Sequence, residues 1–214
     1  MQPPTTALPG KRERTRAAIV NAAIALIAEK GLESSSIDDL MATAGMARGT
    51  FYNYFQCREE VLFSVIREIQ DQLISKVVSH IPADLPPAQV VACMLNGYLQ
   101  FCQDECRIGA VMIRIGGFSP WVDAEDQSMR EGFSRIDAAV EALCGNRVSF
   151  TSARTYLEGM SNNILCHLLG GRIGWNNVEE LVFLTLRGLG MPEREIDKAV
   201  AAARGFAASI AKAG

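Results

Sequence analysis

The sequence contains few of the side chains from which catalytic and metal sites are usually built. Only two of its 214 residues are histidines, and its six cysteines include no pair separated by two residues. Cys102 and Cys106 have the spacing of one helix face, but two thiols without a nearby histidine make a poor metal site. Neither His80 nor His167 belongs to a nucleophile–base pattern, and there is no glycine-rich phosphate loop. We therefore predict no enzyme, no metal site and no cofactor.

Long apolar runs are also missing. No stretch approaches the ~18 apolar residues that a membrane span needs. Residues 1–10 contain three prolines and indicate an unstructured arm rather than a signal peptide. We therefore expect a cytoplasmic protein whose six cysteines are free thiols, most of them buried.

The chain has no overall positive charge. Its 21 basic and 24 acidic side chains give a net charge of −3, so bulk charge does not indicate a nucleic-acid partner. Contact with nucleic acid would have to depend on local clusters, and basic residues do cluster in two segments. They are Lys11, Arg12, Arg14 and Arg16 in the first, and Arg48 and Arg58 in the second.

Apolar residues recur with the period of a helix along most of the chain, and 49% of all residues are hydrophobic, enough for a substantial core. Strand-like alternation and internal repeats are absent, so we predict an all-α fold. Glycine and proline mark the breaks between helices. The expected helices span residues 11–30, 37–44, 47–55, 58–80, 87–104, 106–116, 120–144, 150–170, 177–189 and 192–212.

Residues 37–55 have the pattern of a helix, a glycine-containing turn and a second helix, which is typical of a DNA-binding helix-turn-helix. Ser36 and Asp39 have the spacing of a capping box, and we expect Phe51 and Phe55 to share the buried side of the second helix. The outer side suits a DNA major groove, because arginine can bind guanine, asparagine can bind adenine, and hydroxyls can bind phosphate. Its residues are Arg48, Gly49, Thr50, Tyr52, Asn53 and Tyr54.

This region resembles the TetR family of bacterial regulators, of the TetR/AcrR-like type. The resemblance covers residues 12–65 and consists of several short motifs in the family's order. Two positions depart from the family pattern, because Ala47 and Cys57 stand where serine is common. The matching motifs are Arg16-x-x-Ile19-x-x-Ala22-Ala23, Gly31-Leu32, Ser36-Ile37-Asp38-Asp39-Leu40, the run from Ala44 to Phe55, and Arg58-Glu59-Glu60-Val61-Leu62.

The resemblance implies an all-α homodimer whose two recognition helices lie about one DNA turn apart and bind a near-palindromic operator. It further implies a helical C-terminal domain with a small-molecule pocket and a dimer interface from its last long helices, which we expect within residues 150–189. Family members usually repress transcription and release DNA when a ligand binds. By position, the base-facing residues would be Arg48, Gly49 and Asn53, and the phosphate contacts would be Ser36, Thr50, Tyr52, Tyr54 and Arg58.

We place the domain boundary at the start of the fourth helix, with the DNA-binding domain at residues 1–57 and the ligand-sensing and dimerisation domain at residues 58–214. A mostly hydrophobic effector pocket would draw on aromatic, methionine and hydrogen-bonding residues, although the same residues also suit an ordinary core. Arg114, within an apolar run, would need an anion such as Glu158 or a ligand carboxylate. The candidate pocket residues are Tyr98, Met112, Trp121, Phe133, Tyr156, Met160, Asn163 and His167.

The sequence therefore predicts a sequence-specific DNA-binding regulator, with a repressor released by a small molecule as the preferred form. The alternative is control by a protein partner or by cysteine oxidation, for which Cys102 and Cys106 are the candidates. Neither the effector nor the operator sequence follows from these residues. The dimer interface would use leucine and isoleucine side chains at Leu157, Ile164, Leu168, Leu181, Leu184 and Leu189.

Overall fold

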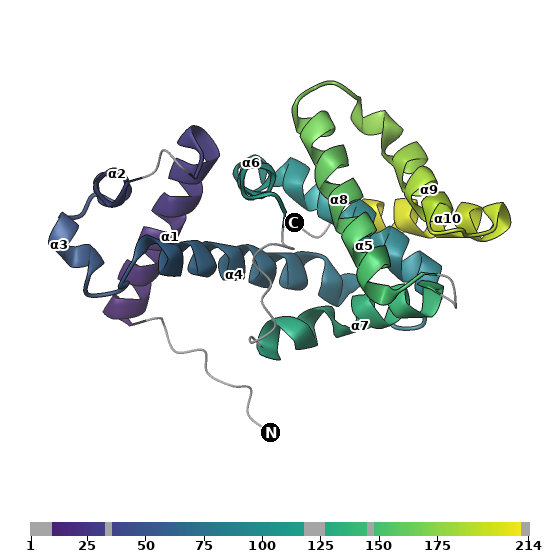
Figure 1. Cartoon of the computed structure of the whole chain (residues 1–214), viewed down its shortest axis with the longest axis horizontal. Helices are drawn as coiled ribbons and strands as arrows, with labels where there is room; N and C mark the ends of the chain where they lie inside the picture. The colour runs from purple at the N-terminus through teal and green to yellow at the C-terminus, as the bar shows by residue number, and fades with distance from the viewer. Residues whose placement is uncertain (1–9, 33–35, 118–126, 145–147, 211–214) are drawn as a thin grey trace. The chain divides into compact units, whose positions relative to one another are not determined.

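A computed structural model describes residues 10–32, 36–117, 127–144 and 148–210, with the side chains of 127–130 left out (Figure 1). All regular elements in these ranges are helical, so the predicted all-α fold class is confirmed. The α-helices are α1 (Lys11–Lys30), α2 (Ile37–Thr43), α3 (Arg48–Phe51), α4 (Arg58–Lys76), α5 (Pro87–Asp104), α6 (Cys106–Ile115), α7 (Gln127–Cys144), α8 (Phe150–Leu169), α9 (Val178–Gly188) and α10 (Glu193–Ile210), with short 3₁₀ turns η1 (Val78–His80) and η2 (Trp175–Asn177).

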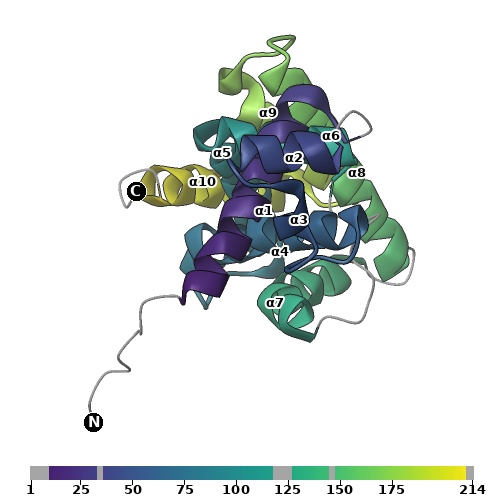
Figure 2. The ribbon, with the colours of Figure 1, turned by 90° about the vertical axis from the view of Figure 1, so that its left-hand side faces the viewer.

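The chain divides into two compact units, and the division falls between Glu68 and Ile69, inside α4. The first unit contains α1, α2, α3 and the first half of α4. Within it α1 packs against α2, and α2 against α3 (Figure 2). Its core includes the predicted stripe of α1 and the apolar faces of the other helices: Ile19, Ala23, Leu26, Ile27, Leu40, Met41, Phe51, Phe55, Leu62 and Val65.

Two features of the first unit differ from the sequence-based expectation. Helix α3 ends at Phe51 and continues only as a tight turn, in which the Asn53 amide donates to the Thr50 carbonyl at 3.2 Å. No side chain caps its start at Ala47, which is consistent with so short a helix. The apolar spacing of residues 37–46 also predicts Ile37, Ala44 and Met46 in the core, but all three are half-buried in the structure.

The second unit is organised around α5, which lies against α6, α7, α8, α9 and α10. Helix α5 is buried on nearly all sides and packs most extensively on α10. Gly97 permits the closest approach, because a Cβ atom there would lie 2.5 Å from Val77 Cγ1 and 3.0 Å from Phe206 Cε1. In the same unit, Arg135 Nη1 of α7 donates to the Ile81 carbonyl at 2.7 Å and fixes the chain that follows η1.

Three predictions for this unit need correction. Cys102 and Cys106 do not share a helix face, because the backbone at Glu105 (φ −104°, ψ 66°) separates α5 from α6. As a result Cys102 is buried and Cys106 is exposed. Arg114 is also exposed, so it does not require a buried anion. Residue 80 lies beyond the end of α4, in η1.

None of the helices in the described ranges is both long enough and apolar enough to cross a membrane.

Candidate nucleic-acid interface

Helix α2 starts at a complete capping box, as the spacing of Ser36 and Asp39 predicts. The Ser36 hydroxyl accepts a hydrogen bond from the Asp39 amide at 3.1 Å and donates to the Asp39 carboxylate at 2.5 Å. Lys30 Nζ lies 3.6 Å from the same carboxylate. The bond from the Ser36 hydroxyl, then that from the Ser36 amide, then the charge of Lys30 lower the pKa of Asp39. Ser36 therefore caps the start of α2 in the free protein.

Helix α3 is held to the first unit by two phenylalanines. Phe51 and Phe55 are 0% and 1% exposed, and their ring centroids lie 5.8 Å apart. Arg16 of α1 stacks on Phe55 at 5.0 Å from the ring centroid, and its Nη2 donates to Ser64 Oγ of α4 at 2.6 Å. Part of the predicted basic cluster is thus used to join α1, α4 and the end of the helix-turn-helix.

Because Phe51 and Phe55 are buried, the polar side chains of α3 and of the turn that follows it point outward. Arg48, Tyr52 and Asn53 are exposed, and Thr50 and Tyr54 are half-buried. Gly49 is exposed, and no atom of the described chain lies within 4 Å of where its Cβ would stand. The fold itself does not need a glycine there, whereas close approach of another molecule's backbone would.

Arg48 already has a partner within the first unit. Its Nη1 lies 2.5 Å from Oδ2 of Asp38 in α2, and both side chains are more than half exposed. Hydrogen bonding to Tyr52, followed by the bond to and charge of Asp38, raises the pKa of Arg48. The arginine predicted from the sequence to face a base is therefore paired with Asp38 in the free protein.

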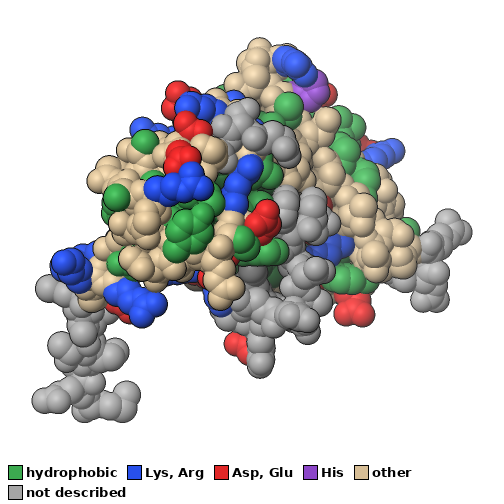
Figure 3. Space-filling model, turned by 60° about the vertical axis from the view of Figure 1, so that its left-hand side comes forward, with side chains coloured by type: hydrophobic (Ala, Val, Ile, Leu, Met, Phe, Trp, Pro, Cys, Tyr) green, Lys and Arg blue, Asp and Glu red, His purple; other side chains and the backbone are tan. Residues whose placement is uncertain are grey.

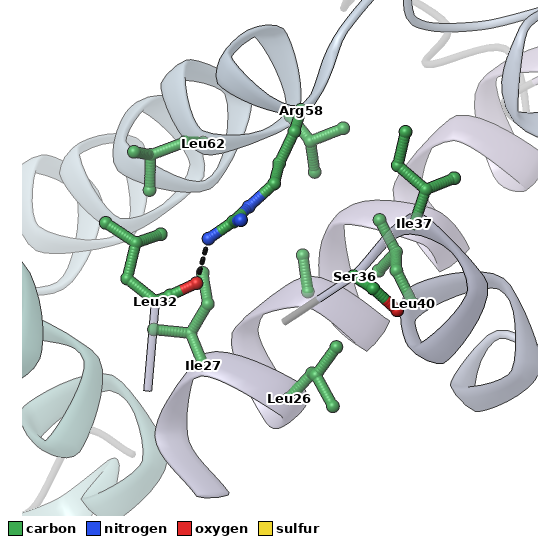
Figure 4. A pocket seen from close by; sticks show the side chains of 10 residues that line it. Leu26, Ile27, Leu32, Ser36, Ile37, Leu40, Arg58 and Leu62 are labelled. Carbon is green, nitrogen blue, oxygen red and sulfur yellow. Dashed lines mark hydrogen bonds between the residues drawn. The ribbon is translucent and has the colours of Figure 1, made fainter. Parts of the chain in front are cut away.

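Arg58, at the start of α4, donates a hydrogen bond to the Leu32 carbonyl and so joins α4 to the segment after α1 (Figure 4). Beside it lies a small hollow of about 30 Å³. Drug-sized ligands need about 300 Å³ or more, so this hollow is too small for an effector. It is lined by Ala23, Leu26, Ile27, Leu32, Ser36, Ile37, Leu40, Arg58, Val61 and Leu62.

The surface that carries these residues is mixed in charge. The face drawn in Figure 3 carries both basic and acidic side chains, scattered among hydrophobic and other surface atoms. Lys11, Arg12 and Arg14, in the first turn of α1, are exposed. They are placed to attract a phosphate backbone, in keeping with local rather than bulk positive charge.

The candidate effector residues of the second unit differ widely in exposure. Tyr98 and Met112 are buried, Asn163 is exposed, and Trp121 lies outside the described residues. The remaining candidates, Phe133, Tyr156, Met160 and His167, are half-buried. Tyr156 is committed to packing of α8 on α9, since its hydroxyl donates to the Thr185 carbonyl at 3.3 Å.

Two polar residues that we did not single out from the sequence are notable in the second unit. Gln70 of α4 is only 2% exposed, and its Oε1 has no hydrogen-bond partner in the described part of the chain. The Oδ1 of Asn162 in α8 is also buried without a partner there. The position of Gln70 between Ile69 and Leu73, in phase with the apolar stripe of α4, is a sequence signal that could have identified it.

The cysteines fall into distinct environments. Burial raises the pKa of Cys102 to about 12 and that of Cys93 to about 11, so both resist formation of the reactive thiolate. Cys57 and Cys106 are exposed, contrary to a mainly buried set, and Cys144 and Cys166 are intermediate. Among the side chains that the structure describes, no three histidine, cysteine or acidic residues are grouped to hold a metal ion.

Comparison with known proteins agrees with the helix-turn-helix geometry. Residues 19–65 match the family "Bacterial regulatory proteins, tetR family". The fatty acid metabolism regulator protein of Bacillus subtilis is 27% identical over 93 residues, covering 44% of this chain and 48% of that protein, so the chain spans about half the length of this relative. The HTH-type transcriptional repressor KstR2 of Mycobacterium tuberculosis is 23% identical over 170 residues, covering 70% and 85%.

The fold extends the likeness beyond the matched segment. The crystal structure of the regulator FadR from Bacillus subtilis in complex with stearoyl-CoA superimposes with a TM-score of 0.60, 19% identity, and coverage of 81% of this chain and 96% of the other. At that identity the likeness concerns the fold alone. Residues 19–65 are therefore a DNA-binding segment of the type found in the TetR family of bacterial regulators, and the chain around it shares the fold of the FadR structure.

Proposed function

We propose that this protein is a transcriptional repressor that binds a near-palindromic operator as a homodimer and is released by a small, mostly hydrophobic effector. The observation that carries the proposal is the outward array of Arg48, Thr50, Tyr52 and Asn53 around the buried Phe51. The matched family consists of regulators, which supports this function over an enzymatic one. Operator binding would place the protein in the cytoplasm.

The DNA part is tested by selecting bound duplexes from a random library and measuring affinity for the selected operator. Arg48→Ala is expected to cost about 1–3 kcal/mol and to relax base preference at one position of each half-site. Tyr54→Phe should weaken binding to all sequences alike. Arg194→Ala removes an exposed cation of the second unit and is the matched control. Affinity that does not fall with added salt would contradict the proposal.

The dimer is proposed to form through α8 and α9. Leu184 of α9 is 51% exposed, and Leu181 of α9 and Leu157 of α8 are half-buried, so leucines supply apolar surface on both helices. Ile164 and Leu168, which we expected at the interface, are instead buried within the protomer. Leu184→Glu should shift the protein to monomer in sedimentation velocity, whereas Ala201→Glu on the exposed side of α10 should not.

The effector is proposed to be mostly apolar with a hydrogen-bond donor. A buried acceptor without a partner costs about 1–3 kcal/mol, and Gln70 and Asn162 each carry one. The structural relative solved with stearoyl-CoA binds a ligand with a long apolar chain, which supports an effector with a large apolar part. Thermal-shift measurements with stearoyl-CoA and with long-chain alcohols test this. Gln70→Leu should remove the stabilisation by the alcohol while leaving the fold intact, because leucine fills similar volume without an acceptor.

Control by cysteine oxidation is less well supported, because Cys102 is buried with a strongly raised pKa and lies on a different helix from Cys106. Operator binding measured with and without peroxide distinguishes the two forms of regulation. Release by peroxide alone, lost in Cys106→Ser, would favour oxidation. Release only by another protein from the same cell would favour a protein partner.

A further inference from the structure

The first turn of α2 carries two neighbouring carboxylates with different tasks. Asp39 is engaged by Ser36 and Lys30 and holds the start of the helix. Asp38 takes no part in that cap. Its Oδ2 instead accepts a hydrogen bond from Arg48 Nη1 at 2.5 Å, ten residues further along the chain, and links α2 to α3.

This link contributes little to holding the two helices together. The side chains of Arg48 and Asp38 are 58% and 62% exposed, and ion pairs so exposed to water add little to stability. Phe51, which is fully buried, already fixes α3 against the first unit. The pair therefore affects the position of the Arg48 side chain, which we propose to face DNA, more than it affects the stability of the fold.

Arg48 has to change partners when it binds a base. The two acceptors of guanine, O6 and N7, can accept hydrogen bonds from the Arg48 guanidinium in place of the Asp38 carboxylate. A phosphate of non-specific DNA also attracts Arg48, but salt screens this attraction. The phosphate also brings negative charge close to the Asp38 carboxylate, which repels it. Exchange of partners is thus favourable at a guanine in the correct position and less favourable elsewhere on DNA.

We propose that Asp38 is a positioning residue that sets DNA specificity, by holding the Arg48 guanidinium in the free protein and yielding it to guanine in preference to non-specific phosphate. The proposal rests on the function proposed above, in which Arg48 contacts a base. Asp38 acts only through Arg48, and it raises the ratio of operator affinity to random-sequence affinity by weakening the latter.

The test uses the full-length protein with two duplexes, the operator selected from a random library and a scrambled duplex of the same composition. Asp38→Asn is expected to raise affinity for the scrambled duplex about two- to fivefold and to leave operator affinity within about twofold. Its salt dependence on the scrambled duplex should steepen by about one released ion, because Arg48 no longer has a carboxylate partner that competes with phosphate. Asp38→Glu, which restores the carboxylate, should recover the specificity ratio.

Loss of one negative charge could itself raise affinity for any DNA, so two controls isolate the contribution of Arg48. Glu59→Gln removes a carboxylate at the exposed start of α4 that interacts with Cys57 and Arg58, so it controls for loss of a negative charge beside a different arginine. In the Arg48→Ala background, Asp38→Asn should change scrambled-duplex affinity no more than Glu59→Gln does. An Asp38→Asn effect of the same size with and without Arg48, or an equal rise for both duplexes, overturns the proposal.

The same measurements separate this inference from the function on which it rests. If Arg48→Ala leaves base preference unchanged, the base-reading role of Arg48 fails and the role of Asp38 fails with it. If Arg48→Ala relaxes base preference while Asp38→Asn leaves the specificity ratio unchanged, only the role of Asp38 is overturned. Thermal melts of each variant establish that it is folded.

Discussion

Gly97→Ala gives a quantitative test of the packing in the second unit. In an exposed helix, replacing glycine by alanine stabilises by about 1 kcal/mol. At Gly97 the added Cβ would lie 2.5 Å from Cγ1 of Val77, which is buried and, being β-branched, has little freedom to rotate away. Overpacking of a buried site costs about 1–3 kcal/mol. We expect the overpacking to exceed the helix gain and to give a net destabilisation of about 1–2 kcal/mol.

Urea unfolding followed by far-ultraviolet circular dichroism measures the effect as a lower midpoint at unchanged slope. Gly205→Ala in α10 is the matched control, since no atom lies within 4 Å of its Cβ position, and it should stabilise by about 0.5–1 kcal/mol. Val77→Ala should relieve the overpacking, so that the double variant is more stable than the sum of the single effects by at least about 0.5 kcal/mol. A midpoint for Gly97→Ala as high as that of Gly205→Ala would refute the close approach of Val77 and α10 to α5 at Gly97.

The other predictions concern the start of α2 and the thiols. Ser36→Ala should cost about 1 kcal/mol in the unfolding of the first unit and weaken operator binding, measured by urea unfolding and by titration with labelled operator. Because the folded pKa of Asp39 is lowered, its stabilisation is present above its ordinary pKa and is lost as pH falls through the lower folded value. Stability should therefore decline below about pH 4 in the wild type and less steeply in Asp39→Asn, and a pH series of thermal melts in which the two decline in parallel would contradict this. Cys57 and Cys106 should react quickly with Ellman's reagent at pH 8, and Cys102 should react only on unfolding. If the folded Cys102→Ser variant has one fewer fast-reacting thiol than the wild type, Cys102 is accessible and the prediction is wrong.

The helix-turn-helix was predictable because its determinants are close together in the chain. Ser36 and Asp39 are three residues apart, and Phe51 and Phe55 are four apart, so helical geometry alone brings each pair together. Most helix bounds in the second unit followed from the same short-range periodicity, but α4 ends at Lys76 rather than at residue 80, and residues 120–126, expected in the helix 120–144, lie outside the described residues. The length of α3 was overestimated, because the local spacing of residues does not show that this helix, which has no side-chain cap at Ala47, ends at Phe51.

What the sequence determined on its own is therefore the set of helices, the helix-turn-helix and the side of it that carries polar groups, all of which depend on contacts within about one or two turns. Tertiary structure alone decided the pairing of Arg48 with Asp38, the engagement of Arg58 with the Leu32 carbonyl, and the exposure of Arg114. These depend on how separate helices pack, and the packing places side chains that are ten or more residues apart within hydrogen-bond distance or leaves them in water. A side chain's periodic position indicates its face of the helix, but only the neighbouring helix determines what that face meets.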